Sequence, residues 1–184
     1  MYSRSNGARN SLICGLLALI AFIGIGLAAA AQETPAGSPE IDYPGFLDLS
    51  SEVFAIREER LVSLGDFNAM KAEEGTIILD TRSREAFEMG HIDGAVNLPF
   101  SDFTVSKLAS VIPSKNTRIL IYCNNNFSDN LAPVMLKRVE LALNIPTFIN
   151  LYGYGYEDIY ELGELTEMSN PDVNWVGMAD LQEN

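Results

Sequence analysis

Short apolar runs alternate with amphipathic segments along most of the chain. Two continuous runs, at 76–80 and 118–123, are typical of strands that are buried on both faces of a parallel sheet. Weaker runs of the same kind lie at 61–63, 95–98 and 147–151. Because successive parallel strands need a crossover connection, which is usually a helix, this order predicts an α/β fold with a mainly parallel central sheet flanked by helices.

The amphipathic segments between these runs predict the helices. They lie at 46–60, 64–72, 84–88, 101–109, 131–142 and 156–162. We expect Ser50 or Ser51 to cap the first helix and Ser83 to cap the third, because a serine hydroxyl accepts a hydrogen bond from a free N–H group of the first turn. A stretch at 32–45 that contains proline and glycine predicts a flexible linker ahead of a single domain at 46–184.

The second long apolar run ends in Cys123 and is followed by a short polar loop. Pro133 is tolerated only in the first turn of a helix, so we expect Asp129 or Asn130 to be the N-cap of the next helix. Loop amides and the helix N-terminus, which carries about half a positive charge, would favour the reactive thiolate of Cys123. The alternative is that Cys123 is a small buried hydrophobic residue.

The first 31 residues differ from the rest of the chain. Arg4 and Arg9 give them a basic start, 12–27 is almost wholly apolar, small residues fill 28–31, and no acid precedes Glu33. This pattern predicts a secretory signal peptide and therefore an exported protein, periplasmic or extracellular. The alternative is a retained membrane anchor, because an apolar run of about 16 to 20 residues is close to the length that spans a bilayer.

The chain is acidic, with a formal net charge of −13. The predicted signal peptide holds two of the 12 basic residues and none of the 25 acids, so its removal would leave a net charge of −15. Such a charge argues against binding to nucleic acid and, once the leader is cleaved, against binding to anionic membrane surfaces. It also opposes the electrostatic attraction of small anionic substrates.

Cysteine usage favours a functional role for Cys123. Cys14 lies in the predicted signal peptide, so cleavage would leave Cys123 alone in a compartment where disulfides are usual. An unpaired cysteine in an exported protein suggests a reactive thiol or an intermolecular bridge. One histidine, His91, and one cysteine are too few for a typical structural zinc site, so we expect no metal and no cofactor.

Two segments carry a resemblance to a known family. The stretch Leu79-Asp80-Thr81-Arg82, followed by Gly90-His91-Ile92-Asp93-Gly94-Ala95 and Pro99, resembles the front motif of the rhodanese-like domain family. Ile119 to Cys123 resembles the strand that leads into the active-site loop of that family, and Gly153 to Tyr156 is a looser match to its glycine-rich turn. The resemblance covers about 61–162 and implies a three-layer fold with a five-stranded, mainly parallel sheet.

The resemblance also implies a chemistry. Cys123 would be the nucleophile that takes a sulfane sulfur from a donor such as thiosulfate, holds it as a persulfide and passes it to a thiol or cyanide. The expected substrate-binding loop consists of Asn124, Asn125, Asn126, Phe127 and Ser128. The resemblance gives Asp80, Arg84 and His91 structural roles.

The loop departs from the pattern of active members, which often carry a basic residue about five positions after the cysteine. Here Ser128 holds that position, Asp129 follows, and no cation lies between Cys123 and Lys137. We therefore expect a neutral sulfur donor or a protein-bound persulfide in place of thiosulfate. Two functions remain open: an exported sulfurtransferase that acts through Cys123 on a thiol acceptor, and a rhodanese-like binding module that contacts a protein partner with little or no turnover.

Overall fold

The computed structural model describes residues 39–177, so the predicted signal peptide at 1–31 and the first part of the predicted linker lie outside the described residues. The folded unit begins at Ile41. Between residues 39 and 177, no helix has both the length and the apolar character that a membrane span requires.

Five parallel strands form the central sheet, in the spatial order β1-β6-β5-β2-β4. They are β1 (Leu61–Val62), β2 (Ile77–Asp80), β4 (Ala95–Asn97), β5 (Ile119–Tyr122) and β6 (Ile159–Leu162). The strand before the cysteine, β5, is central and buried along its whole length. The predicted α/β fold with a parallel five-stranded sheet is confirmed.

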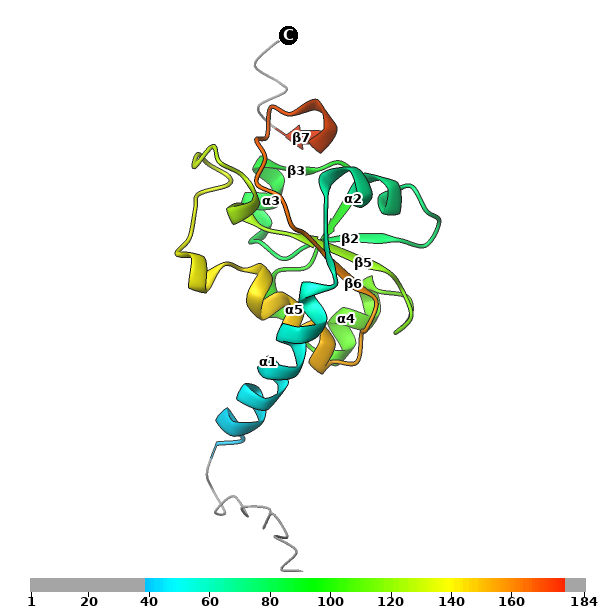
Figure 1. The fold of residues 1–184 in the computed structure, drawn as a ribbon, viewed down its shortest axis with the longest axis vertical. Coiled ribbons are helices and arrows are strands. Elements are labelled where there is room, and N and C mark those ends of the chain that lie inside the picture. The colour runs from blue at the N-terminus through cyan, green and yellow to red at the C-terminus, as the bar shows by residue number, and fades with distance from the viewer. Residues whose placement is uncertain (1–38, 178–184) are drawn as a thin grey trace, which may run out of the picture. The chain divides into compact units, whose positions relative to one another are not determined.

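Helices cover both faces of this sheet (Figure 1). On one face lie α1 (Tyr43–Glu58), α4 (Val105–Val111) and α5 (Asn144–Gly153). The other face carries α2 (Leu64–Lys71), α3 (Arg84–Met89) and an antiparallel pair, β3 (Gly90–Ile92) with β7 (Trp175–Gly177). Short 3₁₀ turns lie at η1 (Phe100–Asp102), η2 (Asn124–Asn126), η3 (Val139–Leu141) and η4 (Pro171–Val173).

Strand β5 supplies both hydrophobic cores. Ile119 and Ile121 pack in the core beneath α1, α4 and α5, whereas Leu120 and Tyr122 pack in the core beneath α2. Successive side chains of a strand point to opposite faces, so Cys123, the next residue, lies on the same side as Ile121. This alternation directs the thiol toward α1 and α5.

The first helix begins earlier than predicted, at Tyr43, inside the predicted linker. Its N-cap is Asp42, whose carboxylate accepts a hydrogen bond from the Gly45 N–H at 2.9 Å. The expected cap at Ser50 or Ser51 is wrong, because both residues lie within the helix and donate their hydroxyl protons to carbonyls one turn back. The predicted Ser83 cap of α3 is confirmed.

The helix predicted at 131–142 is absent. Residues 128–143, which we call the arm, run as an irregular loop that contains only η3 (Figure 1, yellow-green to yellow). Of the expected apolar face, Val134 is buried, whereas Leu131, Met135 and Val139 are exposed. Only Val134 of this stripe reaches a core, so the segment has too little apolar contact to stabilise a helix. Asp129 accepts a hydrogen bond from the Met168 N–H and caps no helix.

Two further assignments are exchanged in the structure. The run at 147–151, predicted as a strand, is the interior of α5, and the segment predicted as a helix at 156–162 contains β6. A short apolar run does not distinguish a buried strand from a buried helix by its periodicity. Gly155, with a φ of +83°, turns the chain between the two elements.

A buried polar cluster holds the end of β2. The Arg82 guanidinium donates to the Asp80 carboxylate at 2.6 Å and to the Gly90 carbonyl at 2.7 Å. The Tyr122 hydroxyl donates to the same carboxylate. Burial is the main reason that the pKa of Tyr122 lies well above that of free tyrosine, so Tyr122 remains a donor at every physiological pH. The cluster joins β2, β5 and the first residue of β3.

We predict that Asp80→Ala destabilises the protein by about 3–5 kcal/mol, because it leaves the Arg82 guanidinium buried without its counter-charge. Urea unfolding followed by circular dichroism measures the change. Glu73→Ala is the matched control, since it removes the partner of Arg118 at an exposed ion pair and should cost at most about 1 kcal/mol. Equal losses in the two variants would contradict the prediction.

Candidate active site

Cys123 lies at the carboxyl edge of the sheet, immediately after β5. Its backbone is extended, and the chain then turns sharply through η2. Only 2% of the residue is exposed. Sites in parallel α/β sheets form at this edge, where the strands end and loops converge.

Backbone N–H groups converge on the thiol. The backbone N–H groups of Asn144, Asn125 and Leu143 lie near the Cys123 thiol and act to lower its pKa. Asn144 is the first residue of α5, a helix of 10 residues, so the positive end of the helix dipole also faces the sulfur. The expected arrangement of loop amides and a helix N-terminus is therefore present, although the helix begins at Asn144 and not after Asp129.

The net effect of the surroundings is nevertheless to raise the pKa of Cys123. Burial is the largest cause, because a thiolate loses its hydration there. The nearby carboxylate of Glu161 raises the pKa further. The resting form of Cys123 at neutral pH is thus the protonated thiol.

An ion pair from outside the cysteine loop stands beside the thiol. Arg57 of α1 donates to Glu161 of β6 through Nε at 2.6 Å and through Nη2 at 2.5 Å. Asn144 donates to the same carboxylate at 3.2 Å. The charge of Cys123 in turn contributes to a raised pKa of Arg57, which is mainly due to the hydrogen bond with Glu161.

A cation therefore lies beside Cys123, but it comes from α1 and is paired with Glu161. Sequence analysis missed Arg57, Glu161 and Asn144, because none of them lies in the cysteine loop and Arg57 lies outside the segment that carries the resemblance. The three residues meet only through the packing of α1 against α5 and β6. Only the charged run from Arg57 to Arg60, at the end of α1 and just after it, could have hinted at such a contact.

Asn126 fixes the loop to its neighbours. Its side-chain oxygen accepts hydrogen bonds from the Cys123 N–H at 2.9 Å and from the Asn144 amide at 3.2 Å. Its side-chain nitrogen donates to the Leu162 carbonyl at 2.7 Å. One buried amide thus joins the cysteine loop, the end of β6 and the start of α5.

The other residues of the expected substrate-binding loop differ in position. Asn124 donates to the Met135 carbonyl, and Asn125 exchanges hydrogen bonds with the backbone of Lys137, so both hold the arm. Phe127 is fully buried between Tyr122 and Trp175. The Ser128 hydroxyl and N–H both donate to the Thr166 carbonyl.

Two pockets are lined in part by residues of this loop. The first, which we call the thiol groove, has a volume of about 730 Å³ and is lined by Cys123. Its other walls come from α1, the arm, the start of α5 and residues 161–165. The second, the cationic pocket, has a volume of about 560 Å³. Asn125 borders both pockets, whereas Cys123 lines only the thiol groove.

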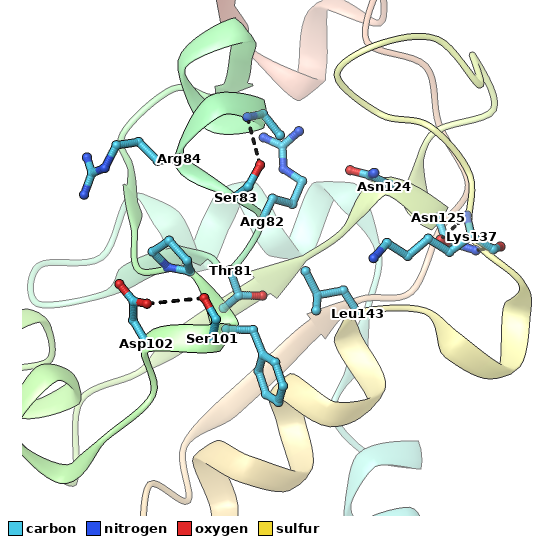
Figure 2. Close-up of a pocket in the computed structure, with 13 residues that line it drawn as sticks. Thr81, Arg82, Ser83, Arg84, Ser101, Asp102, Asn124, Asn125, Lys137 and Leu143 are labelled. Atoms are coloured by element: carbon cyan, nitrogen blue, oxygen red, sulfur yellow. Dashed lines mark hydrogen bonds between the residues drawn. The ribbon is translucent and has the colours of Figure 1, made fainter.

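The cationic pocket lies between the end of β2, the turn η1 and the arm (Figure 2). Figure 2 shows the Lys137 side chain extending toward Leu143, while Arg84 points away from both. Arg84, expected to be structural, is exposed and forms no ion pair with any residue between 39 and 177; the partner of Asp80 is Arg82. His91 lies in β3, where its ring stacks on Phe87 and its Nδ1 contacts the Phe87 carbonyl.

No group of three or more His, Cys, Asp or Glu side chains that could hold a metal ion occurs within the part of the chain that the structure describes. The polar groups around Cys123 are instead backbone amides, an amide side chain and one ion pair. These groups suit anion binding at sulfur and nucleophilic chemistry by the thiolate.

Comparison with known proteins gives a consistent result. A family model for the rhodanese-like domain matches residues 63–162. The chain is 25% identical over 121 residues to adenylyltransferase and sulfurtransferase uba4 of Sclerotinia sclerotiorum, which covers 62% of this chain but only 26% of that protein. It is 24% identical over 95 residues to thiosulfate sulfurtransferase PspE of Escherichia coli, which covers 52% of this chain and 76% of that protein.

Solved structures with a similar fold include a rhodanese-like domain from Anabaena sp., with 21% identity and a TM-score of 0.41, over 56% of this chain and 67% of that one. Thiosulfate sulfurtransferase from Pseudomonas aeruginosa has 15% identity and a TM-score of 0.41, over 67% of this chain and 21% of that one.

We predict that Glu161→Gln lowers the pKa of Cys123, because it removes the carboxylate that opposes the thiolate but keeps an oxygen for Arg57 and Asn144. Alkylation by iodoacetamide at pH 7 should accelerate by up to about tenfold, the effect of one pKa unit. In the wild-type protein, the alkylation rate should still rise with pH beyond about 8.5, the usual pKa of cysteine. Asp158→Asn, which removes an acid paired with Arg60, is the control and should leave the profile unchanged. A slower reaction of the Glu161 variant would contradict the prediction.

We also predict that Asn126→Ala destabilises the protein by at least about 2 kcal/mol, because it leaves the Cys123 N–H and the Leu162 carbonyl buried without partners. Asn125→Ala, which loosens only the contact with Lys137 in the exposed arm, should cost less than about 1 kcal/mol. Chemical unfolding measures both. A larger loss at Asn125 than at Asn126 would show that the arm, and not the buried amide, stabilises the loop.

Proposed function

The chain belongs to the rhodanese-like domain family, and on that basis we propose that it is a sulfurtransferase whose Cys123 carries the transferred sulfur as a persulfide. The observation that supports this most is the position of the thiol. It lies at the carboxyl edge of β5, where the N–H groups of Asn144, Asn125 and Leu143 converge on it. This arrangement can hold a persulfide anion as well as a thiolate.

The reaction has two steps. In the first, the Cys123 thiolate attacks the sulfane sulfur of a donor, a new S–S bond forms at Sγ, and the bond between that sulfur and the rest of the donor breaks with its electron pair on the leaving group. In the second, an acceptor thiolate attacks the outer sulfur of the persulfide and releases the Cys123 thiolate. No external oxidant or reductant is needed, because sulfane sulfur is exchanged between thiols.

The charges near the thiol support a neutral or protein-bound donor. Arg57 is neutralised by Glu161, and the chain as a whole carries a net charge of −13. In the part of the chain that the structure describes, the pocket that Cys123 lines contains one cation, Arg57, which is already paired, so thiosulfate, a dianion, would gain no free counter-charge there. The relative from E. coli is named a thiosulfate sulfurtransferase, and the donor that we propose for this chain differs from the one in that name.

We propose in addition that the protein is exported. The supporting pattern is the basic, then apolar, then small-residue sequence of 1–31, which is typical of a signal peptide. The working location would be periplasmic or extracellular. We propose no membrane contact for the protein once the signal peptide has been cleaved.

A second function, a binding module without turnover, is favoured by one observation. The thiol is only 2% exposed and its pKa is raised, so the resting site is poorly reactive. In that case the exposed arm would contact a protein partner. A Cys123→Ser variant that retains the same partner in the exported fraction would support this function.

Intact-mass analysis tests the proposal. Protein purified from the exported fraction is treated with an excess of a small persulfide whose organic group carries no charge, and is then freed of the donor. We expect a mass increase of one sulfur atom that a thiol acceptor removes again, and no increase in Cys123→Ser. A parallel sample alkylated under denaturing conditions confirms that the thiol is reduced. Absence of sulfur addition in a protein with a reduced thiol would exclude the sulfurtransferase function.

A further inference from the structure

The walls of the thiol groove are mostly apolar. They include Val53 and Phe54 of α1, Val139 of the arm, Ile149 of α5 and Leu165 beyond β6. Several of these side chains are exposed at the rim: Phe54 is 65% exposed, Val139 is 74% exposed and Leu165 is 69% exposed. Large apolar side chains around a concavity are typical of a ligand site, and a volume of about 730 Å³ is within the usual range for small molecules.

The charged groups of the groove offer nothing to an anion. Its lining contains one cation, Arg57, and two acids, Glu161 and Glu164. Arg57 is held by two hydrogen bonds to Glu161. An anionic donor would therefore lose hydration in the groove and gain no counter-charge, whereas a neutral apolar group would lose only unfavourable hydration.

The cationic pocket does not provide an alternative route to the sulfur. Lys137 and Arg84 line it, but Cys123 does not. A donor bound there would contact Asn124 and Asn125 of the loop and not the thiol itself. The groove is the pocket whose wall includes the nucleophile.

We infer that the sulfur donor is a low-molecular-weight organic persulfide that binds in its protonated form, R–S–SH, with its apolar group R in the thiol groove between α1, the arm and α5. This inference rests on the proposed function and names the substrate class of that site. The groove walls select R, while the convergent N–H groups of Asn144, Asn125 and Leu143 face the transferred sulfur.

The step balances without a co-reactant. The thiolate of Cys123 attacks the outer sulfur of R–S–SH and forms the Sγ–S bond. The S–S bond of the donor breaks, and its electron pair leaves on R–S, which takes up a proton as R–SH. The sum is Cys–SH plus R–S–SH giving Cys–S–SH plus R–SH, so the apolar product R–SH occupies the groove until it is released.

A series of n-alkyl persulfides, from methyl to hexyl, tests the inference. The persulfides are released in situ from one type of caged precursor, and the second-order rate of sulfur addition to Cys123 is followed by intact mass. Each added methylene that the groove buries should raise the rate, by up to about fourfold. Thiosulfate at the same concentration should be slower than methyl persulfide.

Matched variants locate the effect. Phe54→Ser with Val139→Ser removes two rim side chains and should flatten the dependence on chain length, so that the ratio of the hexyl rate to the methyl rate falls toward one. The control, Phe46→Ser with Val105→Ser, removes one exposed phenylalanine and one exposed valine that lie outside the groove. Phe46 is 47% exposed and Val105 is 68% exposed. The control should keep the full dependence. All four positions are substantially exposed, so the variants should fold.

The outcomes separate the two proposals. Sulfur addition from methyl persulfide at a rate that does not increase with chain length would overturn this inference and leave the sulfurtransferase function standing. The same conclusion follows if the groove variant and the control variant respond alike. If no donor of the series adds sulfur to a reduced Cys123, both proposals fail.

Discussion

The geometry of the site depends on the side-chain amide of Asn126. It accepts from the Cys123 N–H and from Asn144, and it donates to the Leu162 carbonyl. These groups are buried, so each would lack a partner if the amide were displaced. Because the three contacts belong to the cysteine loop, to α5 and to β6, the amide sets the distance between the thiol and the helix N-terminus. The ion pair of Arg57 with Glu161 is then aligned through Asn144.

The parts of the fold that sequence analysis predicted correctly have signals that are local. The strands β2 and β5 are continuous apolar runs because both faces are buried, and α3 begins at a serine that caps it. The errors concentrate between 131 and 162, where the signal depends on what the segment packs against. Leu131 and Met135 have helical spacing but no core beneath them, and the apolar run of α5 has the composition of a strand.

The residues of the candidate site also differ in whether a local sequence pattern could predict them. Cys123 was predictable, because a cysteine at the end of a buried strand, next to a polar loop, is a local pattern. Arg57 was not, because its role depends on the packing of α1 against α5, and the helix lies outside the resemblance to the family. The conclusion that the loop lacks a cation is correct for the loop itself. The structure adds that a guanidinium lies beside the thiol, already paired with Glu161.

Burial of Cys123 opposes reactivity in the resting protein, since the raised pKa leaves little thiolate at neutral pH. The sulfur-loaded state in the function that we propose is less affected by this cost. A persulfide is a stronger acid than a thiol, so after transfer the site would hold an anion that the N–H groups of Asn144 and Asn125 can bind in a water-poor setting. Interactions that strengthen as the negative charge forms assist the transfer more than interactions with the neutral thiol. An apolar donor that expels water from the groove would strengthen the interactions of the N–H groups with the forming anion. The apolar groove would in this way assist the sulfur transfer at Cys123.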